Sequence, residues 1–180
     1  MKLVILDRDG VINYECAHFI KTPEEWRPIP GSLEAIAALN QAGYRTIVVT
    51  NQSGIARGLF DMTTLNEIHK KMIQELHRMG GHIEAIYFCP HTNEANCSCR
   101  KPKPGLFLEI QRRYHINLAD VPAIGDSLRD LLAAKSAGAQ PVLVITGNGQ
   151  KTFNNGGFPE NTQHYDSLAQ AVQALLSQSS

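Results

Sequence analysis

The feature that most constrains this chain is a regular alternation of short apolar runs with segments of helical periodicity. The apolar runs are rich in β-branched and aromatic residues, as strands are, and they read KLVIL, YRTIVVT, IEAIYFC, VPAIG and PVLVIT. The segments that follow these runs have helical spacing of apolar residues and read SLEAIAALNQAG, a stretch from about Thr64, PGLFLEIQRRYH, SLRDLLAAKSAG and DSLAQAVQALL. This order favours an α/β fold built on a doubly wound parallel sheet.

The segment from about Thr64 carries the clearest helical period. Its apolar positions lie three or four residues apart and are Leu65, Ile68, Met72, Leu76 and Met79. Thr64 and Glu67 have the spacing of a capping box, and Gly80 stands where a C′ glycine would end the helix. We therefore predict a helix between Thr64 and Gly80 that covers the sheet with its apolar face.

Length and composition favour one domain. The chain has 180 residues, of which 43% are hydrophobic, which suits one sizeable buried core. The one long irregular stretch, residues 147–163, is rich in glycine and asparagine, and this predicts a mobile surface loop rather than a second domain. We expect a single domain over residues 1–180.

The charges of the chain are balanced, since Lys plus Arg and Asp plus Glu each number 17. Without a basic excess or a polybasic segment, we expect no nucleic-acid partner and no membrane partner. The apolar run after Met1 ends at Asp7, short of the ~7–15 residues of a signal-peptide core or the ~18 of a membrane span. We expect a cytoplasmic protein and a monomer.

Polar residues stand where several predicted strands end. Asp7 and Asp9 follow the first strand, Thr50 and Asn51 end the second, and Asp126 follows VPAIG. Ligands of such sheets bind beyond the carboxyl ends of the strands, so we expect these side chains on one rim. An isolated aspartate is more often a turn or cap residue, but carboxylates gathered together repel one another unless a hard cation binds them. We predict a Mg²⁺ site made by Asp7, Asp9 and Asp126.

Three thiols and an imidazole gather in the segment CPHTNEANCSC. Cys89, His91, Cys97 and Cys99 are the four soft ligands of a closed tetrahedral zinc site. A redox pair is the alternative, but no Cys-x-x-Cys occurs and the histidine would be unexplained. We predict a structural Zn²⁺ that fixes the backbone of the residues that follow, rather than a catalytic zinc.

The remaining histidines near the second helix and the fourth cysteine have no ligand partners at a suitable spacing. His69, His77 and His82 lie in or after a predicted helix, and Cys16 with His18 gives only two ligands. We interpret these residues as packing or chance.

Four segments of the chain, in sequence order, carry a resemblance to a known family: DRDGVIN, VVTNQSG, CRKPKPG and IGDSLRD. They resemble the four motifs of the haloacid dehalogenase superfamily of phosphatases, and together they span most of the chain. The resemblance implies the superfamily's Rossmann-like core, Mg²⁺ as cofactor and an aspartyl-phosphate intermediate. Because no large insertion follows the first or second strand, we expect no large cap domain and an open site. The four predicted zinc ligands add a small zinc-binding loop to this core.

The resemblance also implies roles for matching residues. Asp7 would be the nucleophile, and Asp9 the general acid and then the general base. Thr50 and Lys101 would contact the phosphoryl oxygens, while Asp126 would complete the Mg²⁺ site with Asp7 and a backbone carbonyl of Asp9. The implied substrate-binding residues are Asn51, Gln52, Ser53 and Arg100.

Two of these positions have open interpretations. Asp130, one turn into a predicted helix, is a partner of the metal, a partner of Lys101, or a carboxylate favoured by the helix dipole alone. Asn51 orients Asp9, contacts the substrate, or belongs only to a strand-to-loop turn.

Within the superfamily, the segments DRDG, VVTNQSGIARG, CPH and CRKP resemble the heptose bisphosphate and histidinol-phosphate phosphatases. This implies hydrolysis of the 7-phosphate of a heptose 1,7-bisphosphate, a small phosphorylated sugar of a bacterial surface-sugar pathway, with histidinol phosphate as the alternative substrate. Other classes fit less well. A receiver domain lacks an acid two residues after its phosphorylated aspartate, a binding module that had lost catalysis would lack a catalytic residue, and a P-loop kinase needs a glycine-rich Lys-Ser/Thr loop.

Overall fold

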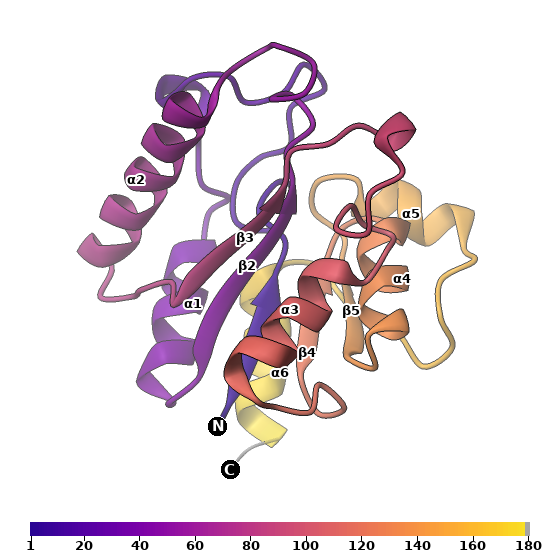
Figure 1. Ribbon diagram of the computed structural model, residues 1–180. Coiled ribbons are helices and arrows are strands. Elements are labelled where there is room, and N and C mark those ends of the chain that lie inside the picture. The colour runs from indigo at the N-terminus through magenta and orange to yellow at the C-terminus, as the bar shows by residue number, and fades with distance from the viewer. Residues whose placement is uncertain (179–180) are drawn as a thin grey trace.

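In the computed structural model, which describes residues 1–178, six parallel strands form one sheet in the order β3-β2-β1-β4-β5-β6 (Figure 1). The strands are β1 (Leu3–Leu6), β2 (Arg45–Asn51), β3 (Ala85–Cys89), β4 (Pro122–Gly125), β5 (Gln140–Val144) and β6 (Gln163–Tyr165). The chain adds strands outward from β1 to β3, then returns to place β4 against the other edge of β1. This confirms the predicted doubly wound parallel sheet, and such sheets bind ligands where the strand order reverses.

Helices cover both faces of the sheet. They are α1 (Ser32–Gln41), α2 (Met62–Arg78), α3 (Gly105–Tyr114), α4 (Leu128–Ser136), α5 (Gly149–Asn155) and α6 (Leu168–Gln178), with short 3₁₀ helices at Pro23–Glu25 and Asn93–Ala95. One core joins α1, α2 and α6 to the sheet, and a second core joins α3 and α4 to the opposite face (Figure 1). Within the described chain, the segment between β1 and α1 contains one short 3₁₀ helix, and the segment between β2 and α2 contains no helix or strand. In residues 1–178, no large cap therefore covers the site.

The central strand β1 is buried along its whole length. Val4 and Leu6 pack into the first core, whereas Leu3 and Ile5 pack into the second. Burial of each such side chain contributes roughly 1.5–3 kcal/mol, so the strand is firmly held between the two layers. The backbone N–H of Asp7 then donates to the Ile124 carbonyl of β4 at 2.9 Å, which fixes this residue at the carboxyl end of the strand.

Helix α2 begins earlier than predicted. Asp61 is its N-cap, and the Asp61 side chain accepts a hydrogen bond from the Thr64 backbone N–H at 2.8 Å. The predicted capping box from Thr64 is therefore wrong, because Thr64 already lies in the first turn. The C-terminal prediction is confirmed, since Gly80 follows the cap residue Met79 with φ +79°. Four of the five predicted apolar positions are buried, while Met79 is exposed.

The stretch 147–163 is not one irregular loop. It contains α5 and reaches the start of β6, which pairs with β5 in parallel. Tertiary contacts stabilise this short helix against its composition: the Thr152 hydroxyl donates to the backbone carbonyl of Asp126 at 2.8 Å. The sequence prediction was wrong here because glycine and asparagine content reports local propensity alone.

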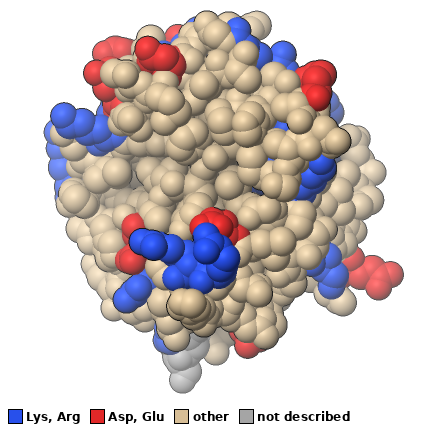
Figure 2. Space-filling model, in the orientation of Figure 1, with Lys and Arg blue, Asp and Glu red and all other residues tan. Residues whose placement is uncertain are grey.

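Charged side chains on the face in Figure 2 lie in small groups of mixed sign rather than in one continuous basic field. In residues 1–178, every helix is too short or too polar to traverse a lipid bilayer.

Candidate active site

A cavity of about 290 Å³ opens at the carboxyl ends of the central strands. Its walls come from segments far apart in the sequence: Asp7 and Asp9 after β1, the loop that contains Glu15 and Phe19, the end of β2 with the residues that follow, the Arg100–Lys101 segment, and Arg129. The predicted residues Asp7, Asp9, Thr50, Asn51, Gln52, Ser53, Arg100 and Lys101 all line it. The fold thus brings almost all of the predicted site to one place.

Three carboxylates lie together at the floor of this site. We call Asp7, Asp126 and Asp130 the carboxylate cluster; all three are buried, and one carboxylate oxygen from each lies within 4.8 Å of the other two. Burial and the neighbouring charge of Asp130 raise the pKa of Asp7 to about 7. Burial and the charges of Asp130 and Asp7 raise the pKa of Asp126 to about 9. Such a donor set fits a divalent cation, which would remove the mutual repulsion.

Lys101 forms direct ion pairs with two members of this cluster. Its ammonium group lies 3.0 Å from Asp7 Oδ1 and 2.7 Å from Asp130 Oδ1, and it donates to the Val49 carbonyl at 2.8 Å. Burial opposes the charge, but Asp130 and Asp7 outweigh it and raise the pKa of Lys101. Lys101 is therefore a fixed positive charge beside Asp7.

The carboxylate of Asp9 lies outside the carboxylate cluster and is bound by other side chains. It accepts hydrogen bonds from the Arg8 guanidinium, from Asn13 at 2.9 Å and from Gln52 at 2.9 Å. Burial works against ionisation, but the Arg8 charge and these hydrogen bonds lower the pKa of Asp9. The carboxylate that lies beside Asp7 and Asp126 is thus that of Asp130, while the Mg²⁺ site of Asp7, Asp126 and the Asp9 backbone carbonyl stays a prediction.

Thr50 and Asn51, at the end of β2, contact different parts of the site. Thr50 is buried and accepts from the Gln52 amide at 2.9 Å, so Gln52 joins Thr50 to Asp9. The Asn51 amide instead pairs with the Lys101 backbone, donating to its carbonyl and accepting from its N–H, both at 3.1 Å. The suggestion that Asn51 orients Asp9 is therefore wrong, because successive strand residues point to opposite sides.

Asp130 is a partner of Lys101, one of the three interpretations that the sequence left open, and it also takes part in a helix cap. It pairs with Lys101, and its Oδ2 accepts from the backbone N–H and the hydroxyl of Ser127, at 3.0 and 2.6 Å. Ser127 caps α4, so these bonds complete a capping box. Asp130 thereby connects the start of α4 to Lys101.

Gly10, Gly147 and the backbone N–H of Asn148 surround Asp126. The sequence analysis did not place Gly147 or Asn148 in the site. The Asn148 backbone N–H donates to Asp126 Oδ2 at 2.7 Å. A Cβ at Gly10 or Gly147 would collide with the Asp126 carboxylate, and both residues have positive φ, +81° and +58°. The stretch predicted to be a mobile loop therefore begins inside the site.

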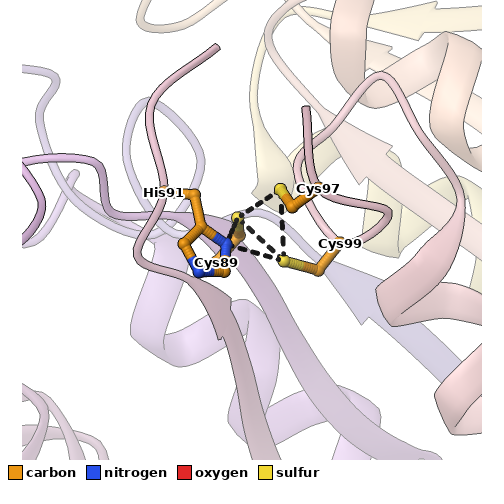
Figure 3. A group of neighbouring side chains, drawn as sticks. All are labelled: Cys89, His91, Cys97 and Cys99. Carbon is orange, nitrogen blue, oxygen red and sulfur yellow. Dashed lines mark hydrogen bonds between the residues drawn. The ribbon is translucent and has the colours of Figure 1, made fainter. Parts of the chain in front are cut away.

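The four predicted zinc ligands, which we call the Cys/His cluster, converge between the end of β3 and the loop before α3 (Figure 3). The sulfur of Cys99 lies 3.0 Å from that of Cys89 and 3.5 Å from that of Cys97, and 3.4 Å from His91 Nδ1. A tetrahedron with Zn–S arms of ~2.3 Å has edges of roughly 3.7 Å, so this arrangement is close to that of a zinc site. The separations are too long for a disulfide.

Arg100 is held by the loop that the Cys/His cluster closes. Its guanidinium donates to the Asn93 side chain at 2.6 Å and to the His91 carbonyl at 3.1 Å, while the residue lines the cavity. Sequence reasoning did not assign Arg57 or Arg129 to the site, although they also line the cavity. Arg57 and Arg129 do stand inside quoted motif segments, IARG and SLRD, which was the available signal.

Comparison with known proteins gives a consistent result. Residues 1–138 match the model of the haloacid dehalogenase-like hydrolases. The D-glycero-beta-D-manno-heptose-1,7-bisphosphate 7-phosphatase of Bordetella bronchiseptica is 56% identical over 176 residues, 98% of each chain. The enzyme of that name from Pseudomonas putida is 50% identical over 176 residues, 98% of this chain and 100% of the relative.

A solved structure extends the likeness to three dimensions. The crystal structure of D,D-heptose 1,7-bisphosphate phosphatase from B. bronchiseptica, complexed with magnesium and phosphate, has a TM-score of 0.98 to this chain. The two are 55% identical, and the match covers 99% of each. The resemblance drawn from the four motifs is thereby confirmed, and the chain belongs to the haloacid dehalogenase-like hydrolase family, as one of its phosphatases.

Proposed function

We propose that this chain removes the 7-phosphate of D-glycero-D-manno-heptose 1,7-bisphosphate through an aspartyl phosphate on Asp7. The observation that carries this proposal is the position of Asp7: it lines the cavity, contacts Lys101 at 3.0 Å and adjoins two more carboxylates. The names of the relatives support the substrate. We further propose that the enzyme acts as a single-domain monomer in the cytoplasm, where a reducing environment suits the thiols of the Cys/His cluster.

In the first half of the reaction, a carboxylate oxygen of Asp7 attacks phosphorus as the bond to the sugar oxygen breaks. Asp9, which takes up a proton when the negatively charged phosphate ester binds beside it, gives this proton to that departing oxygen. Lys101 and the Thr50 hydroxyl stabilise the charge that develops on the phosphoryl oxygens. Mg²⁺, bound by the carboxylates of Asp7 and Asp126 and by the Asp9 backbone carbonyl, would add positive charge beside the same oxygens.

In the second half, a water molecule attacks the aspartyl phosphate. Asp9, now ionised, accepts a proton from this water, the bond between phosphorus and Asp7 breaks, and inorganic phosphate leaves. The hydrogen bonds that lower the pKa of Asp9 favour the ionised form that this step needs. The two steps together consume one water and regenerate Asp7.

We assign a structural Zn²⁺ to the Cys/His cluster. Three thiols and one imidazole, with their ligand atoms converging, leave no position for a catalytic water. The cluster immediately precedes Arg100 and Lys101 in sequence, so the metal would fix the backbone from which both cations extend.

The second phosphate of the substrate has a suitable environment at the cavity mouth. Arg57, Arg100 and Arg129 line the cavity, and the buried Nε of Arg129 has no hydrogen-bond partner within residues 1–178. A buried unpaired donor is costly, and a phosphate oxygen would satisfy it. These cations favour a bisphosphate over a simple ester.

A panel of phosphate esters tests the proposal. We expect the highest kcat/KM for the heptose 1,7-bisphosphate, below it the heptose 7-phosphate, and the lowest for histidinol phosphate. Arg100→Lys should reduce the preference for the bisphosphate, because lysine cannot bind an anion with a planar fork. Arg113→Lys, at an exposed position on α3, is the matched control. A far higher kcat/KM for histidinol phosphate would instead favour the alternative substrate.

A further inference from the structure

Arg8 is a fully buried arginine that the reaction described above does not use. It stands between Asp7 and Asp9 in sequence, and its side chain is 0% exposed. Its Nε donates to Asp9 Oδ1 at 3.0 Å, and its Nη2 lies 2.8 Å from Oδ1 and 3.1 Å from Oδ2. The guanidinium therefore contacts both oxygens of the Asp9 carboxylate from the protein interior.

The other side of this guanidinium contacts a histidine from a distant helix. Arg8 Nη1 lies 3.1 Å from Nε2 of His69, which is on α2 and is also buried. Arginine has only donors, so Nε2 must accept and the ring proton must be on Nδ1. Burial and the nearby Arg8 charge lower the pKa of His69 to about 3, which agrees with a neutral ring. The interpretation of His69 as packing alone missed this bond, because its partner is far away in sequence.

The carboxylate of Asp9 is held from three directions. Arg8 and Asn13 direct their donors at Oδ1, whereas Oδ2 receives the Gln52 amide and the longer contact with Arg8. Oδ2 is the less saturated oxygen and so the one with capacity left for a proton. Its direction depends on the plane of the guanidinium, and His69 limits the rotation of that plane.

We propose that Arg8 and His69 are positioning residues for the reaction, with His69 acting through Arg8 to hold the Asp9 carboxylate toward the departing oxygen. This inference rests on the role of Asp9 in the proposed function. A buried ion pair is weak in stability terms, and apolar residues of similar volume often replace it without loss. A neutral histidine that completes the pair from a separate helix is better explained by orientation than by stability.

The test uses the dependence of the rate on the leaving group. A sugar oxygen needs a proton as it departs, whereas p-nitrophenolate departs readily without one. We define the selectivity ratio as kcat/KM for the heptose bisphosphate divided by kcat/KM for p-nitrophenyl phosphate. This ratio reports only steps through departure of the leaving group, and it does not depend on the fraction of folded enzyme.

The reference variant is Asp9→Asn, for which we expect the ratio to fall by about 10²-fold. His69→Leu removes the acceptor and should lower the ratio by roughly 10-fold. His69→Gln offers an amide oxygen to Arg8 and should restore most of it. His77→Leu, at an exposed position on the same helix, should leave the ratio unchanged. Arg8→Lys, which keeps the charge but not the fork, should lower the ratio as His69→Leu does.

Two results would overturn the inference in distinguishable ways. If Asp9→Asn lowers the ratio while His69→Leu and Arg8→Lys do not, Asp9 is the acid but needs neither residue for its orientation. If Asp9→Asn itself leaves the ratio unchanged, the role proposed for Asp9 fails, and the positioning role fails with it.

Discussion

The carboxylate cluster and the Cys/His cluster are assembled in opposite ways. The Cys/His cluster lies within residues 89–99, whereas the carboxylate cluster joins Asp7 to Asp126 and Asp130 across more than a hundred residues. Pairing of Leu6 with Ile124 between β1 and β4 brings the carboxylates together. The Cys/His cluster therefore depends on a local loop conformation, and the carboxylate cluster depends on the whole sheet. Damage to the first should disturb folding of a loop, while damage to the second should disturb chemistry on an intact fold.

The largest expected effect is that of Asp7→Asn, which tests the carboxylate cluster. Turnover should fall by at least about 10⁴-fold, the order expected when a covalent nucleophile is lost. The fold should persist, because the raised pKa of Asp7 shows that its buried charge is unfavourable without a cation. Phosphate release and the melting temperature measure the two effects.

Asp9→Asn is the matched comparison at the next acidic residue. With an aryl phosphate, Asp7 is still phosphorylated but the water lacks its base, so labelled aspartyl phosphate should accumulate. Retained steady-state activity in Asp7→Asn would exclude the covalent route.

The second prediction concerns the Cys/His cluster. Purified protein should contain about one tightly bound zinc per chain. Cys97→Ser should release this zinc and lower the free energy of unfolding by several kcal/mol, since binding of a structural metal is coupled to folding. Activity should fall with it, because Arg100 and Lys101 follow the cluster.

Cys16→Ser is the control, since Cys16 is exposed and lies outside the Cys/His cluster. It should retain both zinc and stability. Zinc-free protein with full stability and full activity would contradict the local assembly that we infer for this cluster.

The third prediction concerns the pH dependence of stability, to which the carboxylate cluster should contribute when Mg²⁺ is absent. Without Mg²⁺, the folded-state pKa values of Asp7 and Asp126, about 7 and about 9, lie above the ordinary value of 3.8. The folded state then binds more protons than the unfolded state, so stability should fall as pH rises above about 4, by at most about 1.4 kcal/mol per pH unit for each carboxyl.

Millimolar Mg²⁺ should reduce this slope, because the cation takes the place of the bound protons, and it should restore activity reversibly. Urea unfolding at pH 5 and pH 8, with and without Mg²⁺, measures the effect. The tightly bound zinc should remain in both preparations. Identical slopes with and without Mg²⁺ would mean that the carboxylate cluster is not the magnesium site.

The same contrast explains what the sequence could predict. The Cys/His cluster could be predicted because its four ligands form a local sequence pattern. The end of β1 could be predicted because Asp7 directly follows four apolar residues, which the fold buries. The approach of the Asp130 carboxylate to Asp7 and Asp126 could not be predicted, because it depends on the pairing of Asp130 with the distant Lys101. Likewise, the bond from Asn148 to Asp126 joins a loop to a strand end through the backbone, which no side-chain pattern records.

The smallest effect that we predict is that of loosening the cavity wall. Like the carboxylate cluster, this wall is held by a residue that is distant in sequence. Lys71 of α2 donates to the carbonyls of Pro23 and Trp26 at 2.8 and 2.9 Å, and so anchors the loop that contributes Glu15 and Phe19 to the cavity. Lys71→Met should lower the free energy of unfolding by about 1 kcal/mol. It should also raise KM for the heptose bisphosphate severalfold, because the loosened loop forms part of the cavity wall.

The rate with p-nitrophenyl phosphate should change little, since the two hydrogen bonds of Lys71 end at Pro23 and Trp26 rather than at Asp7, Asp9 or Lys101. Lys70→Met, at the neighbouring exposed position on the same helix, should leave stability and both KM values unchanged. Equal losses with both substrates in Lys71→Met would show that the anchor acts on the catalytic floor rather than on the wall. The loop would then support the catalytic residues, as the sheet supports the carboxylate cluster. Substrate selection would have to come from the arginines that line the cavity, Arg57, Arg100 and Arg129.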